Sequence, residues 1–120
     1  MTIQECYEAF GGNYAEVVSR LRTDERIARF LQKVVTDGSY QLLCDSIASG
    51  NIEEAFRAAH TLKGVCMNLS ITRFAQSASE LTEALRGKTA VTDDLKPLLE
   101  RVKEDYELTI SCIKQLTVEG

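Results

Sequence analysis

The sequence predicts an all-α fold, an antiparallel four-helix bundle with short N-terminal covering helices. Composition is the first reason: the 120 residues include one Pro, seven Gly and no Trp, a balance that favours helices and supplies few of the turn residues that a sheet needs. The second reason is periodicity, because apolar residues recur at helical spacing in segments separated by polar residues or glycine. The length is that of one domain, and 44% hydrophobic residues suffice for one core.

The first segments are short and are predicted to form an N-terminal cover. Asn13 follows two glycines, and Glu16 lies three residues further on, a spacing that resembles a capping box. An apolar stripe follows at Tyr14, Val17, Val18 and Leu21. We therefore expect one domain over residues 1–120, with the cover at about 1–22 and the bundle at about 23–116.

The first bundle segment has a polar start and an interruption. Thr23 is a candidate N-cap, and the two acidic residues after it suit the positive end of a helix dipole. The apolar face that follows is Ile27, Phe30, Leu31, Val34 and Val35. Gly38 interrupts this face, which resumes from Tyr40 to Ile47, so the sequence permits either one bent helix or two helices joined at Asp37-Gly38.

Three further segments complete the predicted bundle. Asn51, followed by Glu54, opens a helix whose core stripe is Ile52, Ala55, Ala59, Leu62, Cys66 and Leu69. Ser70 is a candidate cap for the next helix, which ends before Gly87. Asp93 or Asp94 caps the last helix, where Pro97 is tolerated in the first turn. Short connections make sequence neighbours antiparallel neighbours in space.

Charge and cysteine content exclude several functions. The net charge is −4 and the pI is about 5.0, which argues against a nucleic-acid partner. The N-terminus lacks a basic region followed by an apolar run, and no apolar stretch is long enough for a membrane. Four scattered cysteines without a C-x-x-C pattern predict reduced thiols rather than a metal site. We expect a cytoplasmic protein.

His60 is the only histidine, and it lies beside the apolar stripe of the helix predicted over about 52–69. At about 100° per residue its side chain falls roughly 110–120° from the centre of the stripe, at the border of core and solvent. Lys63, one turn onward, brings a cation alongside the ring. Gly64 costs about 0.5–1 kcal/mol relative to alanine inside a helix. Either a partner or a neighbouring helix backbone gains from the missing side chain.

Phosphoryl chemistry accounts for all three residues. A neutral imidazole nitrogen is a nucleophile near pH 7, a lysine ammonium stabilises phosphoryl oxygens, and a glycine leaves room for a bulky partner. The chain has no nucleotide-binding loop of the form G-x-x-x-x-G-K-[ST], so another protein must supply the phosphoryl group. The sequence therefore predicts a phosphoryl carrier that is not an enzyme with its own kinase site.

The segment AHTLKG at 59–64, with Asn68-Leu69 following, resembles the H-x-L-K-G signature of histidine-phosphotransfer (HPt) domains. The runs 52–59 and 78–85 are also similar to this family, so the resemblance covers about residues 23–116. It implies a helical bundle that shuttles a phosphoryl group between aspartates of receiver domains in a multistep phosphorelay. In this resemblance His60 is the phosphoacceptor through Nε2, Lys63 stabilises the phosphate and Gly64 provides clearance. The family also implies that Mg²⁺ enters with the partner receiver domain, so we predict no cofactor or metal site here.

The surface around His60 carries the candidate docking residues Glu53, Phe56, Arg57 and Met67. Glu53 and Arg57 are either partner contacts or part of a solvated face, and Phe56 and Met67 also suit packing at the edge of the core. Many family members carry a small residue where this chain has Met67 and a glycine where it has Ser70. The expected partners are receiver domains of response regulators or hybrid sensor kinases. We expect this chain to bind them as a monomer. The alternative is a helical adaptor that is not phosphorylated and docks a receiver domain or dimerises.

Overall fold

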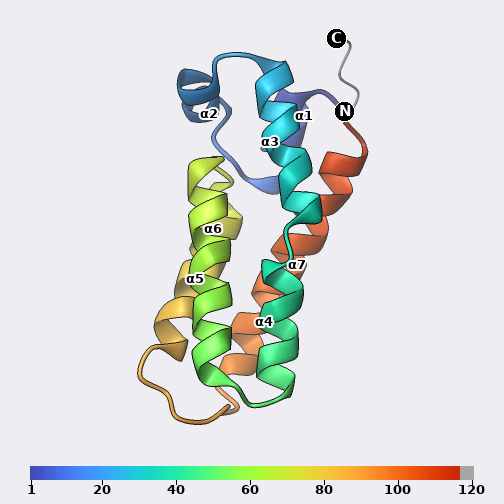
Figure 1. Cartoon of the computed structure of the whole chain (residues 1–120). Coiled ribbons are helices and arrows are strands. Elements are labelled where there is room, and N and C mark those ends of the chain that lie inside the picture. The colour runs from blue at the N-terminus through green and yellow to red at the C-terminus, as the bar shows by residue number, and fades with distance from the viewer. Residues whose placement is uncertain (117–120) are drawn as a thin grey trace.

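The computed structural model describes residues 1–116, and the only regular elements in that range are helices. Residues 117–120, which the predicted single domain includes, lie outside the described residues. The helices are α1 (Ile3–Phe10), α2 (Tyr14–Leu21), α3 (Asp24–Thr36), α4 (Ser39–Ala48), α5 (Ile52–Asn68), α6 (Thr72–Leu85) and α7 (Leu95–Lys114). The molecule is elongated, with extents of 47 × 22 × 19 Å (Figure 1).

Helices α4 to α7 alternate in direction and form the bundle, with α5 packed against both α4 and α6 (Figure 1). Helix α3 continues the line of α4 beyond the bundle and packs on α7, while α1 and α2 cover the same end. The predicted all-α bundle with short covering helices is confirmed. The interruption at Gly38 separates two helices rather than bending one, and the Asp37 carboxylate accepts a hydrogen bond from the backbone N–H of Ser39 at 2.8 Å.

Polar caps begin three of these helices as the sequence predicts. The side-chain oxygens of Asn13, Thr23 and Asn51 each accept a hydrogen bond from the backbone N–H three residues on, at 3.0, 3.3 and 3.1 Å. These bonds satisfy N–H groups that have no partner within the helix. Asp94 occupies the cap position of α7 but makes no side-chain capping bond. It pairs instead with Lys88, at 3.0 Å.

Ser70 is not the cap of α6, so that prediction is wrong. The N-cap position belongs to Ile71, and its side chain cannot cap. Ser70 lies one residue earlier with φ of +53°, in the left-handed region that favours glycine. Its hydroxyl donates to Glu16 at 2.7 Å and accepts from Arg20. The serine therefore ties the α5–α6 turn to α2, which offsets the unfavourable backbone geometry.

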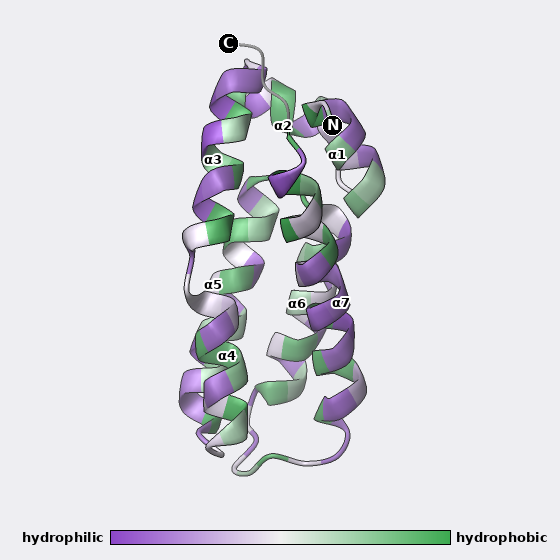
Figure 2. Cartoon of the chain, turned by 90° about the vertical axis from the view of Figure 1, so that its right-hand side faces the viewer, coloured by the Kyte–Doolittle hydropathy of each residue, from purple (hydrophilic) through white to green (hydrophobic). Residues whose placement is uncertain are grey.

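The core runs the length of the molecule, and hydrophobic and hydrophilic residues alternate along each helix (Figure 2). Its largest fully buried side chains are Tyr7, Phe10, Phe74, Ile27, Leu31, Leu43, Ile71, Leu81, Leu85, Leu95, Ile113 and Val17. They come from every helix except α5, whose buried face consists mostly of small residues. Within residues 1–116, no helix has both the length and the apolar character needed to cross a membrane.

The cover is anchored at the turn that ends α5. The Tyr7 hydroxyl donates to the backbone carbonyl of Leu69 at 2.7 Å, and the backbone N–H of Asn13 donates to the carbonyl of Ser70 at 2.8 Å. A Cβ added at Gly12 would lie 2.6 Å from the Tyr7 ring and 2.8 Å from the Ser70 carbonyl oxygen. Gly12 therefore permits a close approach of its backbone to Ser70 and Tyr7 that any residue with a Cβ would prevent.

Replacing Gly12 with alanine is expected to destabilise the protein by about 2 kcal/mol, because an overpacked contact with backbone cannot relax by moving a side chain. Chemical denaturation followed by circular dichroism measures the change. Gly38→Ala is the matched control, since a Cβ there meets no atom within 4 Å, and it should change stability by less than about 0.5 kcal/mol. Equal stability of the two variants would show that the N-terminal cover shifts to accommodate the added methyl group.

Candidate functional site

Helix α5 carries the predicted site on the face opposite its buried side. The buried residues of α5 are Ala55, Ala58, Ala59, Leu62 and Cys66. Because most of these side chains are small, α5 can lie close to α4 and α6. His60 lies on the outer face and is exposed, so the helix presents the imidazole on a rigid support. The sequence predicts a ring at the border of core and solvent, and the structure has it exposed.

The His60 ring has an aromatic neighbour one turn earlier on the same helix. The rings of Phe56 and His60 are nearly parallel, with centroids 6.2 Å apart and an angle of 9° between the planes. At this separation the rings are offset rather than in face-to-face contact. Phe56 is half-buried and packs against the core edge, so it links the exposed ring to the body of the bundle.

The C-terminal end of α6 adds two charged residues that sequence reasoning missed, Glu83 in the last turn and Arg86 at the C-cap. The Arg86 guanidinium lies 5.0 Å from the centroid of the Phe56 ring, within the range of a cation–π interaction. Glu83 accepts hydrogen bonds from Arg86 Nε at 3.1 Å and from Nη2 at 3.0 Å. These bonds and the Arg86 charge lower the pKa of Glu83, and the nearby Lys63 and His60 lower it further. Both residues therefore belong to the surroundings of His60.

Lys63 and Gly64 lie on the two flanks of His60. At about 100° per residue, Lys63 is turned toward the Phe56 side of the helix and Gly64 toward the other side. Lys63 is half-buried, and its effect on the pKa of Glu83 is that of a neighbouring charge. A Cβ added at Gly64 would meet no atom within 4 Å. No neighbouring helix backbone approaches Gly64, so packing does not explain the glycine.

The predicted docking residues surround His60 along α5. Arg57 pairs with Glu53 at 2.9 Å and with Glu54 at 3.1 Å, and the Arg57 and Glu53 side chains are largely exposed. Met67 is 53% exposed, although its backbone carbonyl accepts a hydrogen bond from Arg20 at 3.2 Å. All of these side chains are accessible on the face of His60 or at its edge. Their role in docking stays a prediction.

An open groove of about 370 Å³ adjoins this surface at the start of α5 and the end of α6. It is lined by Ile52, Glu53, Phe56, Leu85, Arg86, Gly87 and Lys88. The lining combines apolar side chains with the cations Arg86 and Lys88 and the carboxylate of Glu53, which suits a partner that presents a hydrophobic residue among charged ones. Among residues 1–116, no group of three or more His, Cys, Asp or Glu is arranged to hold a metal ion.

Comparison with known proteins identifies this arrangement. A family model for the Hpt domain matches residues 22–111, which include all of α5 and α6. The chain belongs to the Hpt domain family. Hpt domains are phosphocarrier modules rather than kinases, and membership implies histidine phosphotransfer in a two-component phosphorelay with receiver domains as partners. Searches of curated proteins and of solved structures gave no match.

Proposed function

We propose that this Hpt domain accepts a phosphoryl group on His60 from a receiver-domain aspartate and passes it to the aspartate of another receiver domain. The observation that carries the proposal is the exposed imidazole at the middle of α5, with Lys63 on one flank and the open surface over Gly64 on the other. A planar nucleophile, a cation and free space are what an incoming acyl phosphate needs.

The transfer step conserves charge and needs no further reactant. The lone pair of His60 Nε2 attacks the phosphorus of the aspartyl phosphate, and a P–N bond forms as the P–O bond to the aspartate breaks. The bonding electron pair leaves with the aspartate as a carboxylate, and the ring keeps its proton on Nδ1. The return step to a second aspartate reverses these changes, so the same face serves both directions.

Lys63 and Arg86 supply the positive charge for the transferred group in this proposal. Lys63 is one turn from His60 on the same helix, and Arg86 is held over Phe56 by Glu83. The transition state spreads negative charge over three phosphoryl oxygens, which nearby cations stabilise. Glu83 limits the net positive charge at the site and keeps the Arg86 guanidinium in place when no phosphoryl group is present.

We further propose that receiver domains dock over Glu53, Phe56, Arg57 and Met67, and that the groove beside Phe56 is part of this surface. In this proposal the receiver domain binds a monomer of this chain, and binding takes place in the cytoplasm. The described cysteines are all free thiols, three of them buried, which suits a reducing compartment.

The test is to incubate the purified protein with a panel of ³²P-phosphorylated receiver domains and Mg²⁺. We expect label on this chain that is labile in acid and stable in base, the behaviour of a phosphohistidine and not of an aspartyl phosphate. Binding without label would favour the unphosphorylated adaptor. Label that is lost in base would place the phosphoryl group on a different side chain and contradict the proposal.

Replacing Lys63 with alanine is expected to slow phosphoryl transfer by about ten- to a hundredfold, because the lost cation acts on the moving charge. Receiver binding should change little, since the ammonium contacts the phosphoryl group rather than the partner's surface. Rapid-quench kinetics and a separate binding titration measure the two effects. Lys96→Ala removes an exposed lysine on α7 and is the control. If Lys63→Ala and Lys96→Ala transfer at the same rate, Lys63 has no part in the mechanism.

A further inference from the structure

The groove between α6 and α7 contains a buried carboxylate that phosphotransfer at His60 does not use. Asp105 projects from α7 with only 7% of its side chain exposed. Its Oδ1 accepts a hydrogen bond from Arg73 Nε at 3.1 Å, whereas its buried Oδ2 has no hydrogen-bond partner. A buried carboxylate oxygen without a partner is costly. It requires a donor from outside the chain.

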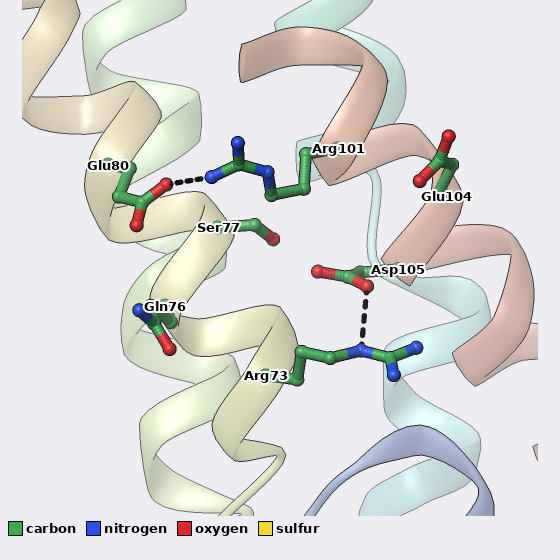
Figure 3. A pocket seen from close by; sticks show the side chains of 7 residues that line it. All are labelled: Arg73, Gln76, Ser77, Glu80, Arg101, Glu104 and Asp105. Atoms are coloured by element: carbon green, nitrogen blue, oxygen red, sulfur yellow. Dashed lines mark hydrogen bonds and ion pairs between the residues drawn. The ribbon is translucent and has the colours of Figure 1, made fainter. Parts of the chain in front are cut away.

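Arg73 leaves this oxygen unsatisfied although its guanidinium could contact both. Arginine commonly holds a carboxylate through two parallel hydrogen bonds, but here only Nε takes part, and the rest of the guanidinium points away from Asp105 (Figure 3). The second carboxylate oxygen instead points across the groove toward Ser77 (Figure 3). The acceptor is therefore directed into open space between the helices.

The space that Oδ2 faces is large enough for a small molecule. The groove has a volume of about 400 Å³, within the range of small-ligand sites. It is lined by Arg73, Gln76, Ser77, Glu80, Arg101, Glu104 and Asp105. The Arg73–Asp105 and Arg101–Glu80 pairs bridge α6 and α7 at its two ends (Figure 3). Both ion pairs therefore join the two helices across the groove.

The charges of the lining residues determine which charge a bound ligand must carry. Three carboxylates and two guanidinium groups surround the groove, which leaves one negative charge in excess. The Ser77 hydroxyl donates to the Phe74 carbonyl at 3.1 Å, so its oxygen lone pairs remain as acceptors. A ligand that enters here meets unsatisfied acceptors and excess negative charge. It must bring N–H donors and one positive charge.

We propose that this groove binds a small organic ammonium ion, whose N–H group donates to Asp105 Oδ2. None of the lining residues belongs to the candidate site around His60, so the inference does not depend on the proposed phosphotransfer. A ligand held here would contact both α6 and α7 and would stabilise the folded state in proportion to its occupancy.

The test titrates the full chain with n-butylammonium at constant ionic strength and follows the backbone amide signals by NMR. We expect saturable shifts for residues 73–80 and 101–105, and none with n-butyrate, which has the same length and the opposite charge. Asp105→Asn should weaken binding by about tenfold or more, since it removes the charged acceptor. Asp93→Asn removes the same charge at an exposed site on a different segment and should bind as the wild type does.

A second variant keeps the test valid if Asp105→Asn fails to fold. Gln76→Trp fills the groove from the exposed side of α6 and leaves the Arg73–Asp105 pair in place. It should also weaken binding by about tenfold or more. The absence of saturable shifts in the wild type would overturn the proposal, and so would wild-type affinity in Gln76→Trp. In either case water, not an ammonium ion, satisfies Oδ2.

Discussion

Replacing His60 with glutamine is expected to abolish phosphoryl acceptance and to leave the helix content unchanged. The imidazole is the proposed nucleophile, and a glutamine side chain has no nitrogen lone pair that can form the P–N bond. The ring is exposed and makes no hydrogen bond to the rest of the chain among the described residues, so its loss removes only the offset stacking on Phe56. Transfer of ³²P from a receiver domain and far-UV circular dichroism measure the two parts of the expectation.

Thr61→Gln is the control for this substitution. Thr61 is the next residue on α5 and is also exposed, so the variant introduces the same side chain beside an intact imidazole. It should retain the acid-labile label that His60→Gln lacks. Wild-type labelling of His60→Gln would mean that a different side chain accepts the phosphoryl group, and the assignment of His60 would then be wrong.

Replacing Gly64 with leucine is expected to weaken receiver docking by about tenfold or more while the protein itself becomes no less stable. A Cβ at this position meets no atom of this chain, so the isobutyl group projects into the surface that a partner must approach. A side chain that holds the two proteins apart near the centre of their interface removes the best-packed contacts, and affinity falls accordingly. Helix propensity favours the substitution. The two effects therefore have opposite signs, and a merely destabilised variant could not produce both.

Gly64→Ala provides a graded comparison. One methyl group extends little into the free space, so docking should be nearly retained, and thermal unfolding should show a gain of about 0.5–1 kcal/mol. Receiver titrations and denaturation curves on the three proteins give both quantities. Normal docking by the leucine variant would remove the clearance role from Gly64 and leave the glycine without an explanation in this structure.

Local signals predicted the helices well because each depends on a few neighbouring residues. The caps at Thr23 and Asn51 need only the residue three positions further on, and both form as expected. The prediction for Ser70 is wrong because distant residues compete for its hydroxyl. The hydroxyl has the right chemistry for a cap, but Glu16 and Arg20, more than 45 residues away in the sequence, bind it instead. No local pattern contains that competition.

The site shows the same division between local and distant information. Phe56 shares a helix face with His60 at a spacing of four residues, and helical geometry alone predicts their proximity. Glu83 lies in α6 and Arg86 at its C-cap, and their approach to Phe56 depends on how α6 is rotated against α5. The only sequence signal for them was an acidic and a basic residue three positions apart. Asp105 was missed because a charged residue in an amphipathic helix is expected on the solvent side, whereas this carboxylate is among the buried residues of α7.

The place of His60 along α5 has a consequence for any group attached to it. His60 is eight residues from either end of the helix that spans Ile52–Asn68, so the surrounding backbone N–H groups already bond to carbonyls within the helix. Anions at helix starts are commonly held by free backbone amides, and that rigid cradle is absent at a helix centre. In the proposed function, a phosphoryl group on His60 would be held by the flexible side chains of Lys63 and Arg86. Such contacts are easily broken, which suits a phosphoryl group that is transferred to a second protein rather than retained.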